Sequence, residues 1–263
     1  MGTSNNDWAL ILGASSGFGA ATAVELAKHG FHIFGVHLDR KATMPNVERI
    51  MAEIRGQERK AVFFNINASD PEKRQEAVER MASEVGDAQV RVLLHSLAFG
   101  TLRRFTPDDP KEAITKAQMD MTLEVMANSL VYWTQALVFR NLMREGGRIY
   151  AMTSSGGHRV WMSYGPVSAA KAALESHCRQ LALELAPRGI TVNAIQAGVT
   201  DTPALRKIPG NQEMVEIAKE RNPMGRLTTP EDVAKAIALL THPDNYWMTG
   251  NVIRVDGGED IVG

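Results

Sequence analysis

The sequence has a single cysteine, Cys178, and no long apolar run. One cysteine excludes a disulfide framework within the chain, and its place in an apolar-periodic helical stretch indicates a buried structural thiol. No apolar run reaches the length of a membrane span. The opening residues, MGTSNNDW, lack the basic and apolar regions of a secretory signal. The expected location is therefore a reducing cytoplasm, away from the membrane.

Positively and negatively charged residues are nearly equal in number. Lys and Arg number 29 against 30 Asp and Glu, so nucleic acid is not the expected ligand, because a phosphate backbone recruits a basic surface. The histidines are scattered without metal-ligand spacing, and we expect no metal site. A chain of 263 residues is long enough for one large α/β domain with a buried core.

Short apolar runs alternate with helical patterns along the whole chain. Seven of these runs are predicted strands, at residues 8–12, 31–36, 61–64, 90–94, 148–152, 190–195 and 251–255. The intervening helices include a long one over roughly 111–144 and another over 165–186. Nearly continuous apolar strands separated by helices are typical of a parallel sheet covered on both faces. We therefore predict one Rossmann-like, doubly wound α/β domain spanning residues 1–263, with about seven parallel strands.

A glycine-rich turn, GASSGFG at residues 13–19, follows the first strand and leads into a helix. Glycines here permit a tight turn and close approach to a pyrophosphate, and the helix N-terminus supplies N–H groups. The spacing G-x3-G-x-G differs from the common G-x-G-x-x-G pattern. The turn predicts a dinucleotide-phosphate site formed by Gly13, Ser15, Ser16, Gly17, Phe18 and Gly19.

Residues after the second and third strands bear on the choice of cofactor. Asp39 would bind the adenosine ribose hydroxyls and favour NAD, whereas Arg40 and Lys41 would favour the 2′-phosphate of NADP. Both kinds of residue are present, so NADH and NADPH stay open, and the basic pair favours NADPH. Asn65 and Ile66 would offer an amide and an apolar face to the adenine.

Tyr164 and Lys171 stand seven positions apart at the start of the predicted 165–186 helix. Positions seven apart share a helix face, so both side chains can enter one cleft. A nearby cation lowers the pKa of a phenol, and the lysine can hold a ribose. Ser154 follows the fifth strand, and ligands of open parallel sheets bind at the carboxyl ends of strands. We predict catalytic functions for Tyr164, Lys171 and Ser154, and further cofactor contacts from Lys171, Ser96, Leu97, Ala98, Ala197, Gly198, Val199 and Thr200.

Together these residues resemble the short-chain dehydrogenase/reductase superfamily. The glycine turn, the serine, the tyrosine–lysine pair and the terminal VDGG stretch occur in family order from Trp8 to about Gly258. The common family pattern is Tyr-x3-Lys, which would place the tyrosine at Val167, but this chain has Tyr-x6-Lys. That spacing, with the HSLAF stretch from His95 to Phe99, is similar to the divergent branch that contains the bacterial enoyl-(acyl-carrier-protein) reductases.

The resemblance implies NAD(P)H-dependent reduction of the C=C bond of a trans-2-enoyl thioester carried on acyl carrier protein or coenzyme A. It implies that Tyr164 stabilises the enolate oxygen, as an oxyanion-hole donor does, and that Lys171 holds the cofactor ribose. It also implies a lid over the acyl chain at residues about 200–222, and a homotetramer packed through the long helices.

Two departures from the enoyl-reductase pattern leave other interpretations open. Ser154 occupies the ordinary catalytic-serine position, which favours a carbonyl reductase, such as a 3-oxoacyl reductase, or an alcohol dehydrogenase. The helix asparagine of ordinary members maps near Glu124, with Asn128 one turn further, and the sequence does not choose between them. A non-catalytic nucleotide-binding scaffold is the third interpretation, and the intact Tyr164 and Lys171 count against it.

Overall fold

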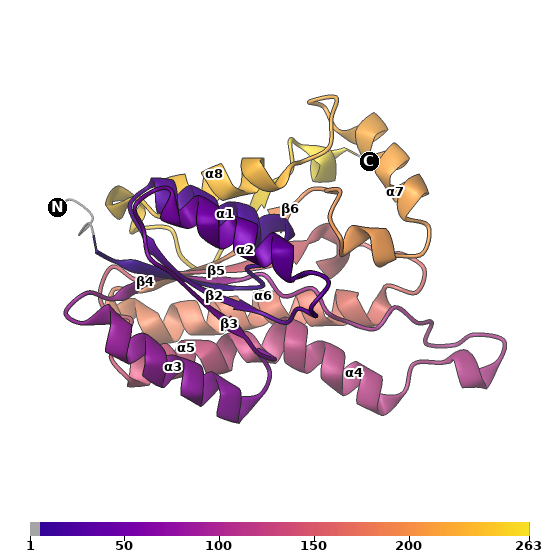
Figure 1. Ribbon diagram of the computed structural model, residues 1–263. Helices are drawn as coiled ribbons and strands as arrows, with labels where there is room; N and C mark the ends of the chain where they lie inside the picture. Colours follow the sequence, from indigo (N-terminus) through magenta and orange to yellow (C-terminus); the bar gives the residue numbers. More distant parts are fainter. Residues whose placement is uncertain (1–5, 263) are drawn as a thin grey trace.

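A computed structural model describes residues 6–262 of the chain. Residues 1–5, part of the start expected to carry no secretory signal, and Gly263 lie outside this range. Within it, one sheet has the order β3-β2-β1-β4-β5-β6-β7, and all neighbouring pairs are parallel. The strands are β1 (Trp8–Leu12), β2 (His32–His37), β3 (Ala61–Asn65), β4 (Val90–His95), β5 (Arg148–Ser154), β6 (Thr191–Ala197) and β7 (Val252–Val255) (Figure 1). The predicted Rossmann-like sheet is confirmed.

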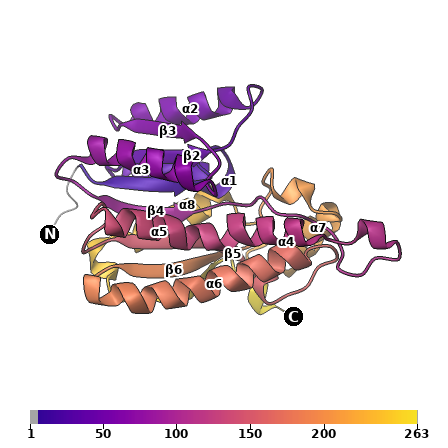
Figure 2. The same cartoon turned by 90° about the horizontal axis from the view of Figure 1, so that it is seen from below.

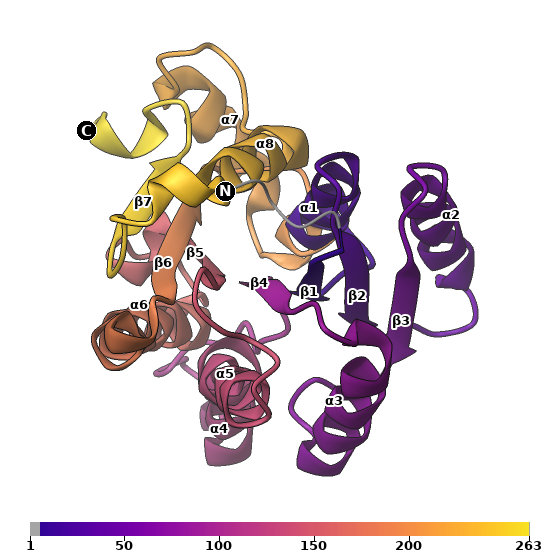
Figure 3. The same ribbon diagram turned by 90° about the vertical axis from the view of Figure 1, so that its left-hand side faces the viewer.

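Helices cover both faces of the sheet (Figure 3). One face carries α1 (Gly17–Lys28), α2 (Met44–Arg55) and α8 (Pro230–Leu240). The other carries α3 (Pro71–Val85), α4 (Lys116–Leu123), α5 (Ser129–Phe139) and α6 (Gly165–Leu185), and Figure 2 shows this face from below. A further helix, α7 (Asn211–Arg221), lies beyond the sheet near the C-terminus (Figure 1). Among residues 6–262, no helix is both long and apolar enough to cross a membrane.

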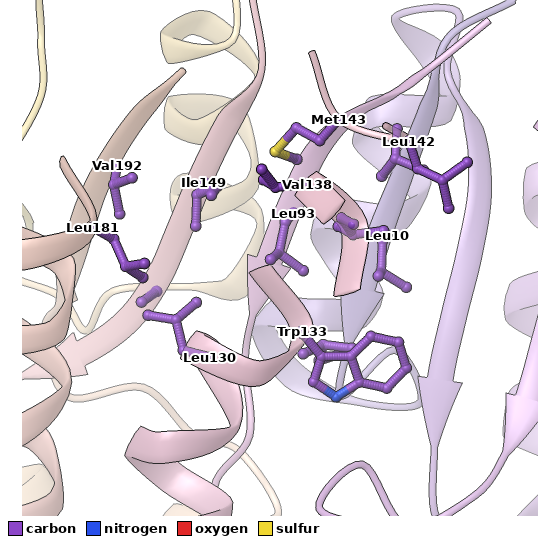
Figure 4. Packing of buried hydrophobic residues seen from close by; sticks show 14 of the residues in the cluster. Leu10, Leu93, Leu130, Trp133, Val138, Leu142, Met143, Ile149, Leu181 and Val192 are labelled. Carbon is purple, nitrogen blue, oxygen red and sulfur yellow. The ribbon is translucent and has the colours of Figure 1, made fainter. Parts of the chain in front are cut away.

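The alternating side chains of β1 divide the core into two layers. Trp8, Leu10 and Leu12 pack on the α3–α5–α6 side, whereas Ala9 and Ile11 pack on the α1–α8 side. Trp133 of α5 fills the first layer, and its indole N–H donates to the Ala68 carbonyl at 2.9 Å (Figure 4). Each large apolar side chain buried in this way contributes roughly 1.5–3 kcal/mol, so the sheet is a rigid base for the loops at its carboxyl edge.

The helix after β4 is shorter than the predicted stretch of roughly 111–144. It begins at Lys116, because Thr115 forms a capping box there, and α5 ends at Phe139. The two helices are joined by a π-helical turn, η2 (Glu124–Asn128). A π turn inserts one extra residue and rotates the side chains that follow it, so positions counted along an ideal helix are displaced here.

Candidate active site

A cavity of about 490 Å³ lies at the carboxyl ends of β1, β4, β5 and β6. Because β1, β4, β5 and β6 are neighbours in the sheet, the loops that follow them meet at one edge. The structure brings the three catalytic candidates together in this cavity with many of the predicted cofactor contacts. The lining includes Tyr164, Lys171, Ser154, Phe18, Ser96, Leu97, Ala98, Ala197, Gly198, Val199 and Thr200.

The glycine turn is packed so closely that two of its glycines cannot be replaced without moving backbone. A Cβ on Gly13, which has φ of 91°, would lie 2.3 Å from the carbonyl oxygen of Ser96. A Cβ on Gly19 would lie 2.1 Å from the carbonyl oxygen of Gly13. Ser16, the residue before α1, makes no side-chain hydrogen bond to the first turn of that helix. The N–H groups of the first turn are therefore open to an anion. The predicted loop residues Ser15 and Gly17 belong to the same turn.

Asp39 lies beyond the end of β2 and faces the glycine turn. Its carboxylate Oδ2 is 3.0 Å from Nδ1 of His37. The backbone N–H of Asp39 donates to Oδ1 of Asn65, and the backbone carbonyl of Asp39 accepts from the Asn65 side-chain N–H. Burial alone would raise the pKa of Asp39, but interactions with Thr43, Ser15 and His37 outweigh burial and lower it. The carboxylate is therefore held ionised at the β2 edge.

The other candidates at this edge do not line the cavity. Arg40 and Lys41 are exposed, whereas Ile66 is partly buried and packs against the core. The Ile66 N–H donates to the His37 carbonyl at 2.8 Å, which joins the ends of β2 and β3. Asp39, Arg40, Asn65 and Ile66 thus form a separate cluster on the β2–β3 side of the glycine turn.

Tyr164 immediately precedes α6 and follows Ser163, whose φ of 64° is uncommon for a residue other than glycine. Its ring lies against Gly156, where a Cβ would be 2.5 Å from Cε1 of the tyrosine. Burial raises the pKa of Tyr164, and only Ser154 acts in the opposite direction. The predicted lowering of this pKa by Lys171 is wrong, because desolvation of the phenol dominates. Tyr164 is a protonated donor at neutral pH.

Lys171 lies on the same side of α6, with only 6% of the residue exposed. Its ammonium Nζ donates to the Met152 carbonyl of β5 at 2.6 Å. Burial lowers its pKa to about 8, although Glu175 and Cys178 act in the opposite direction. Cys178 itself is buried, and burial raises its pKa to about 12, so this thiol is the structural one that the sequence predicts. Lys171 is therefore a fixed cation at the floor of the cavity.

Ser154, the last residue of β5, points its hydroxyl toward the tyrosine side of the cavity. Its Oγ is buried and has no hydrogen-bond partner of ordinary geometry among residues 6–262. A Cβ on Gly156 would lie 3.1 Å from this Oγ and also against the Tyr164 ring. The absence of a side chain at Gly156 therefore leaves room for Ser154 and Tyr164 side by side. A buried hydroxyl left unpaired in this way is poised for a ligand atom.

Neither Glu124 nor Asn128 lines the cavity. The Asn128 side-chain N–H donates to Glu124 at 3.3 Å, and its Oδ1 accepts from Nε2 of His177 at 3.1 Å, in a groove between α5 and α6. Instead, Ser129 faces inward, where its hydroxyl donates to the Val125 carbonyl and lies 2.8 Å from Nε2 of the fully buried His95. Burial lowers the pKa of His95 to about 3, so this histidine is neutral. Neither Glu124 nor Asn128 therefore meets the cavity directly, and Ser129 is the residue of this turn that contacts His95.

The segment over the cavity lines it with more apolar than polar side chains, although Lys207 and Arg221 also line it. Residues about 200–222, the predicted lid, contribute the short turn at Leu205–Lys207 and helix α7. From this segment, Leu205, Ile208, Met214 and Ile217 line the cavity opposite β4 and β5. The apolar lining gives the cavity room for a hydrocarbon chain beside Tyr164.

Several lining residues were not singled out by sequence reasoning. Gly156 separates the tyrosine from the serine, and Glu259 and Asp260 come from the C-terminal end of the chain. Arg159 joins this group through an ion pair with Asp260, at 2.8 Å between Nε and Oδ1. The positions of Glu259 and Asp260 depend on the packing of the C-terminal turn, for which the sequence offers no local signal.

The residues present fit a nicotinamide dinucleotide. An open helix N-terminus beside the closely packed Gly13 and Gly19 suits a pyrophosphate, the ionised Asp39 suits a ribose, and Lys171 and the unpaired Ser154 hydroxyl lie further along the same edge. The strand order places these features in sequence from β2 through β1 to β5. A ligand lying along the edge would meet all of them.

Residues 13–259 match the family model described as enoyl-(acyl carrier protein) reductase. The chain is 28% identical over 249 residues to the 3-oxoacyl-(acyl-carrier-protein) reductase of Thermotoga maritima, covering 95% of this chain and 96% of that one. It is 35% identical over 175 residues to the NADH enoyl-(acyl-carrier-protein) reductase of Synechocystis sp., covering 65% of each. The structure matches the enoyl-(acyl-carrier-protein) reductase (NADH) of Aquifex aeolicus with a TM-score of 0.84 and 25% identity, over 98% of this chain and 97% of that one.

Proposed function

Because this chain belongs to the short-chain dehydrogenase/reductase superfamily and to the family of the enoyl-(acyl carrier protein) reductase model, we propose that it reduces the C=C bond of a trans-2-enoyl thioester with a reduced nicotinamide dinucleotide. Members of this superfamily are oxidoreductases, and this chain is one of them.

The position of the tyrosine carries the proposal. Val167, where the common Tyr-x3-Lys pattern would place the phenol, is buried with Met126 and Ala170. The phenol instead comes from Tyr164, at the mouth of α6 and on the same cavity as Lys171. The wider spacing places the phenol directly before α6, three residues ahead of Val167, on a cavity whose apolar lining suits a thioester conjugated to a C=C bond.

The bound cofactor supplies the hydride, which adds to Cβ of the enoyl thioester. Negative charge then develops on the thioester oxygen, and the protonated Tyr164 donates a hydrogen bond to that oxygen. Lys171 holds the cofactor ribose and adds a fixed positive charge below the site. The apolar side chains of residues about 200–222 exclude water and contact the acyl chain. A proton from solvent completes the saturated product at Cα.

We further propose that NADH is the preferred cofactor. The support is Asp39, whose carboxylate is ionised and is held in place by His37 and Asn65. A fixed carboxylate accepts hydrogen bonds from a ribose diol and repels a 2′-phosphate. Arg40 and Lys41, which favour NADPH in the sequence, are exposed, whereas Asp39 is held by hydrogen bonds.

Reduction of a C=O bond is the second candidate, and Ser154 favours it. Its buried and unpaired hydroxyl lies beside the Tyr164 ring, separated by Gly156. In that reaction Ser154 would bind the ketone oxygen while Tyr164 donates a proton to it. The similarity to a 3-oxoacyl reductase along almost the whole chain supports this alternative.

We propose a homotetramer, because two separate surfaces expose large apolar side chains. Tyr132, Phe139 and Leu183 are exposed on α5 and α6, whereas Leu239 and Trp247 are exposed near α8 and β7. Two different two-fold interfaces generate a tetramer with dihedral symmetry. Light scattering should then give four times the 28.8 kDa mass of the chain.

Two substrates distinguish these proposals. Purified protein is mixed with NADH or NADPH and either a crotonyl or an acetoacetyl thioester, on coenzyme A and on acyl carrier protein. Oxidation of the cofactor by the crotonyl thioester supports C=C reduction, whereas oxidation by the acetoacetyl thioester alone supports carbonyl reduction. Binding of cofactor without oxidation by either substrate would favour a non-catalytic scaffold.

A further inference from the structure

The C-terminal turn η7 (Glu259–Ile261) places a carboxyl group in the candidate active site. Oε2 of Glu259 accepts a hydrogen bond from the backbone N–H of Val199 at 3.0 Å, and both residues line the cavity. The same oxygen would lie only 2.8 Å from a Cβ placed on Gly198. The mechanism proposed above gives this carboxyl group no part.

The backbone of the turn is anchored independently of the Glu259 side chain. Asp256 accepts from the N–H groups of Gly258 and Asp260. Asp260 in turn binds Arg159 at 2.8 Å, with further contacts to His158, Arg254 and Gln196 around the same carboxylate. The Glu259 carboxylate makes no ion pair among residues 6–262. Its side chain can therefore leave Val199 while the turn stays in place.

The N–H of Val199 stands where the nicotinamide end of a dinucleotide would lie. The ribose acid is at β2 and the phosphate turn is at β1, so the rest of the cofactor extends over β4 and β5 toward β6. Val199 is the second residue after β6, beside the cavity of Tyr164 and Lys171. A carboxamide oxygen needs a donor there, and it is an acceptor of the same shape as a carboxylate oxygen.

We propose that Glu259 is an internal competitor of the cofactor, since its carboxylate occupies the Val199 N–H that the nicotinamide carboxamide requires. Binding then has two parts: the Glu259 side chain swings out, and the carboxamide oxygen accepts from Val199. This inference rests on the proposed cofactor site. The competition lowers the affinity for the cofactor below that of the same site without Glu259, because the hydrogen bond between Glu259 and Val199 must be broken first.

The charge of Glu259 makes the competition depend on pH. Burial raises its pKa, and Asp256 and Asp260 raise it further, while the bond from Val199 and the charge of Arg159 act in the opposite direction. The ionised carboxylate is the stronger acceptor and also repels the anionic cofactor. Affinity should therefore increase as the pH falls through the raised pKa of Glu259.

The test is the Kd of NADH and NADPH, measured by fluorescence titration without substrate from about pH 5 to pH 8. Glu259→Ala should bind about tenfold more tightly than the unchanged chain at the upper pH, which corresponds to about 1.4 kcal/mol. Glu259→Gln retains an uncharged acceptor and should bind about threefold more tightly, with a flatter pH dependence. Because Glu259→Gln keeps His158, Asp256 and Asp260, the difference between its profile and that of the unchanged chain isolates Glu259.

Glu231→Gln, at an exposed glutamate of α8 outside the cavity, is the matched control and should leave the Kd unchanged. Amide exchange adds a direct readout, because the Val199 N–H should lose protection in Glu259→Ala and regain it when NADH binds. Weaker or unchanged cofactor binding in both Glu259 variants would overturn the competition and make Glu259 a brace of the loop. Failure of every variant and of the unchanged chain to bind either cofactor would instead overturn the proposed function, and the competition with it.

Discussion

Replacing Tyr164 with phenylalanine separates the chemistry of the site from its packing. The variant keeps the ring and its contact with Gly156, and it removes only the hydroxyl. Loss of one donor to a developing oxyanion lowers kcat by about 10²–10³, or roughly 2.7–4 kcal/mol. Among residues 6–262 the hydroxyl makes no hydrogen bond of ordinary geometry and has only a weak interaction with Ser154, so the free energy of unfolding should change by at most about 1 kcal/mol. Cofactor affinity should stay the same, because the phenol acts in the transition state.

The assay for Tyr164→Phe follows the absorbance of the reduced nicotinamide during turnover, together with the Kd of the cofactor and a thermal melt. Tyr150→Phe is the matched control. Tyr150 is a buried tyrosine of β5 that lies outside the cavity, and burial raises its pKa to about 12. The control should keep its turnover while losing about as much stability, through its bond to Thr241. An unchanged kcat in Tyr164→Phe would refute the assigned function of the phenol.

Three further variants test the same edge of the sheet. Gly156→Ala should lower kcat by about 10²-fold with a fold intact by circular dichroism, because the new Cβ meets Tyr164 at 2.5 Å; full activity would contradict the close contact. Turnover of the unchanged enzyme should fall above pH about 8, where Lys171 loses its proton. Lys171→Met should bind cofactor more weakly and should not show this fall. Without cofactor, the free energy of unfolding of the unchanged chain should rise by at most about 3 kcal/mol between pH 8 and 10.5, because Lys171 is then protonated only in the unfolded state. Denaturant titrations of Lys171→Met should lack this rise. Asp39→Ala should lower the preference for NADH over NADPH by about tenfold, and an unchanged ratio of Kd values would remove Asp39 from cofactor selection.

The sequence predicts those parts of the fold that local patterns determine. The helix at Pro71–Val85 begins and ends at signals present in the sequence, because Asp70 caps it, Pro71 suits its first turn and Gly86 follows its end. The parallel direction of the strands also follows from their alternation with helices. The sequence therefore predicts that Tyr164, Lys171, Ser154 and the β6 loop lie at one edge of the sheet. The structure brings them together there.

The features that the sequence could not predict depend on contacts between distant residues. Glu259 meets Val199 across 60 positions, and no local pattern announces that bond. Asn128 lies on the same face as Glu124 but in an outer groove, where it bonds Glu124 and His177, and the π turn η2 over these residues has no local sequence signal. The raised pKa of Tyr164 reflects burial rather than the nearby Lys171, and burial of a single side chain is a property of the whole fold.

The most direct test of the central proposal is oxidation of NADH by a crotonyl thioester, measured beside an acetoacetyl thioester with the same purified protein. The account predicts rapid oxidation with the crotonyl thioester, and its loss in Tyr164→Phe. Oxidation by the acetoacetyl thioester alone would contradict it and would make Ser154 and Tyr164 the partners in carbonyl reduction.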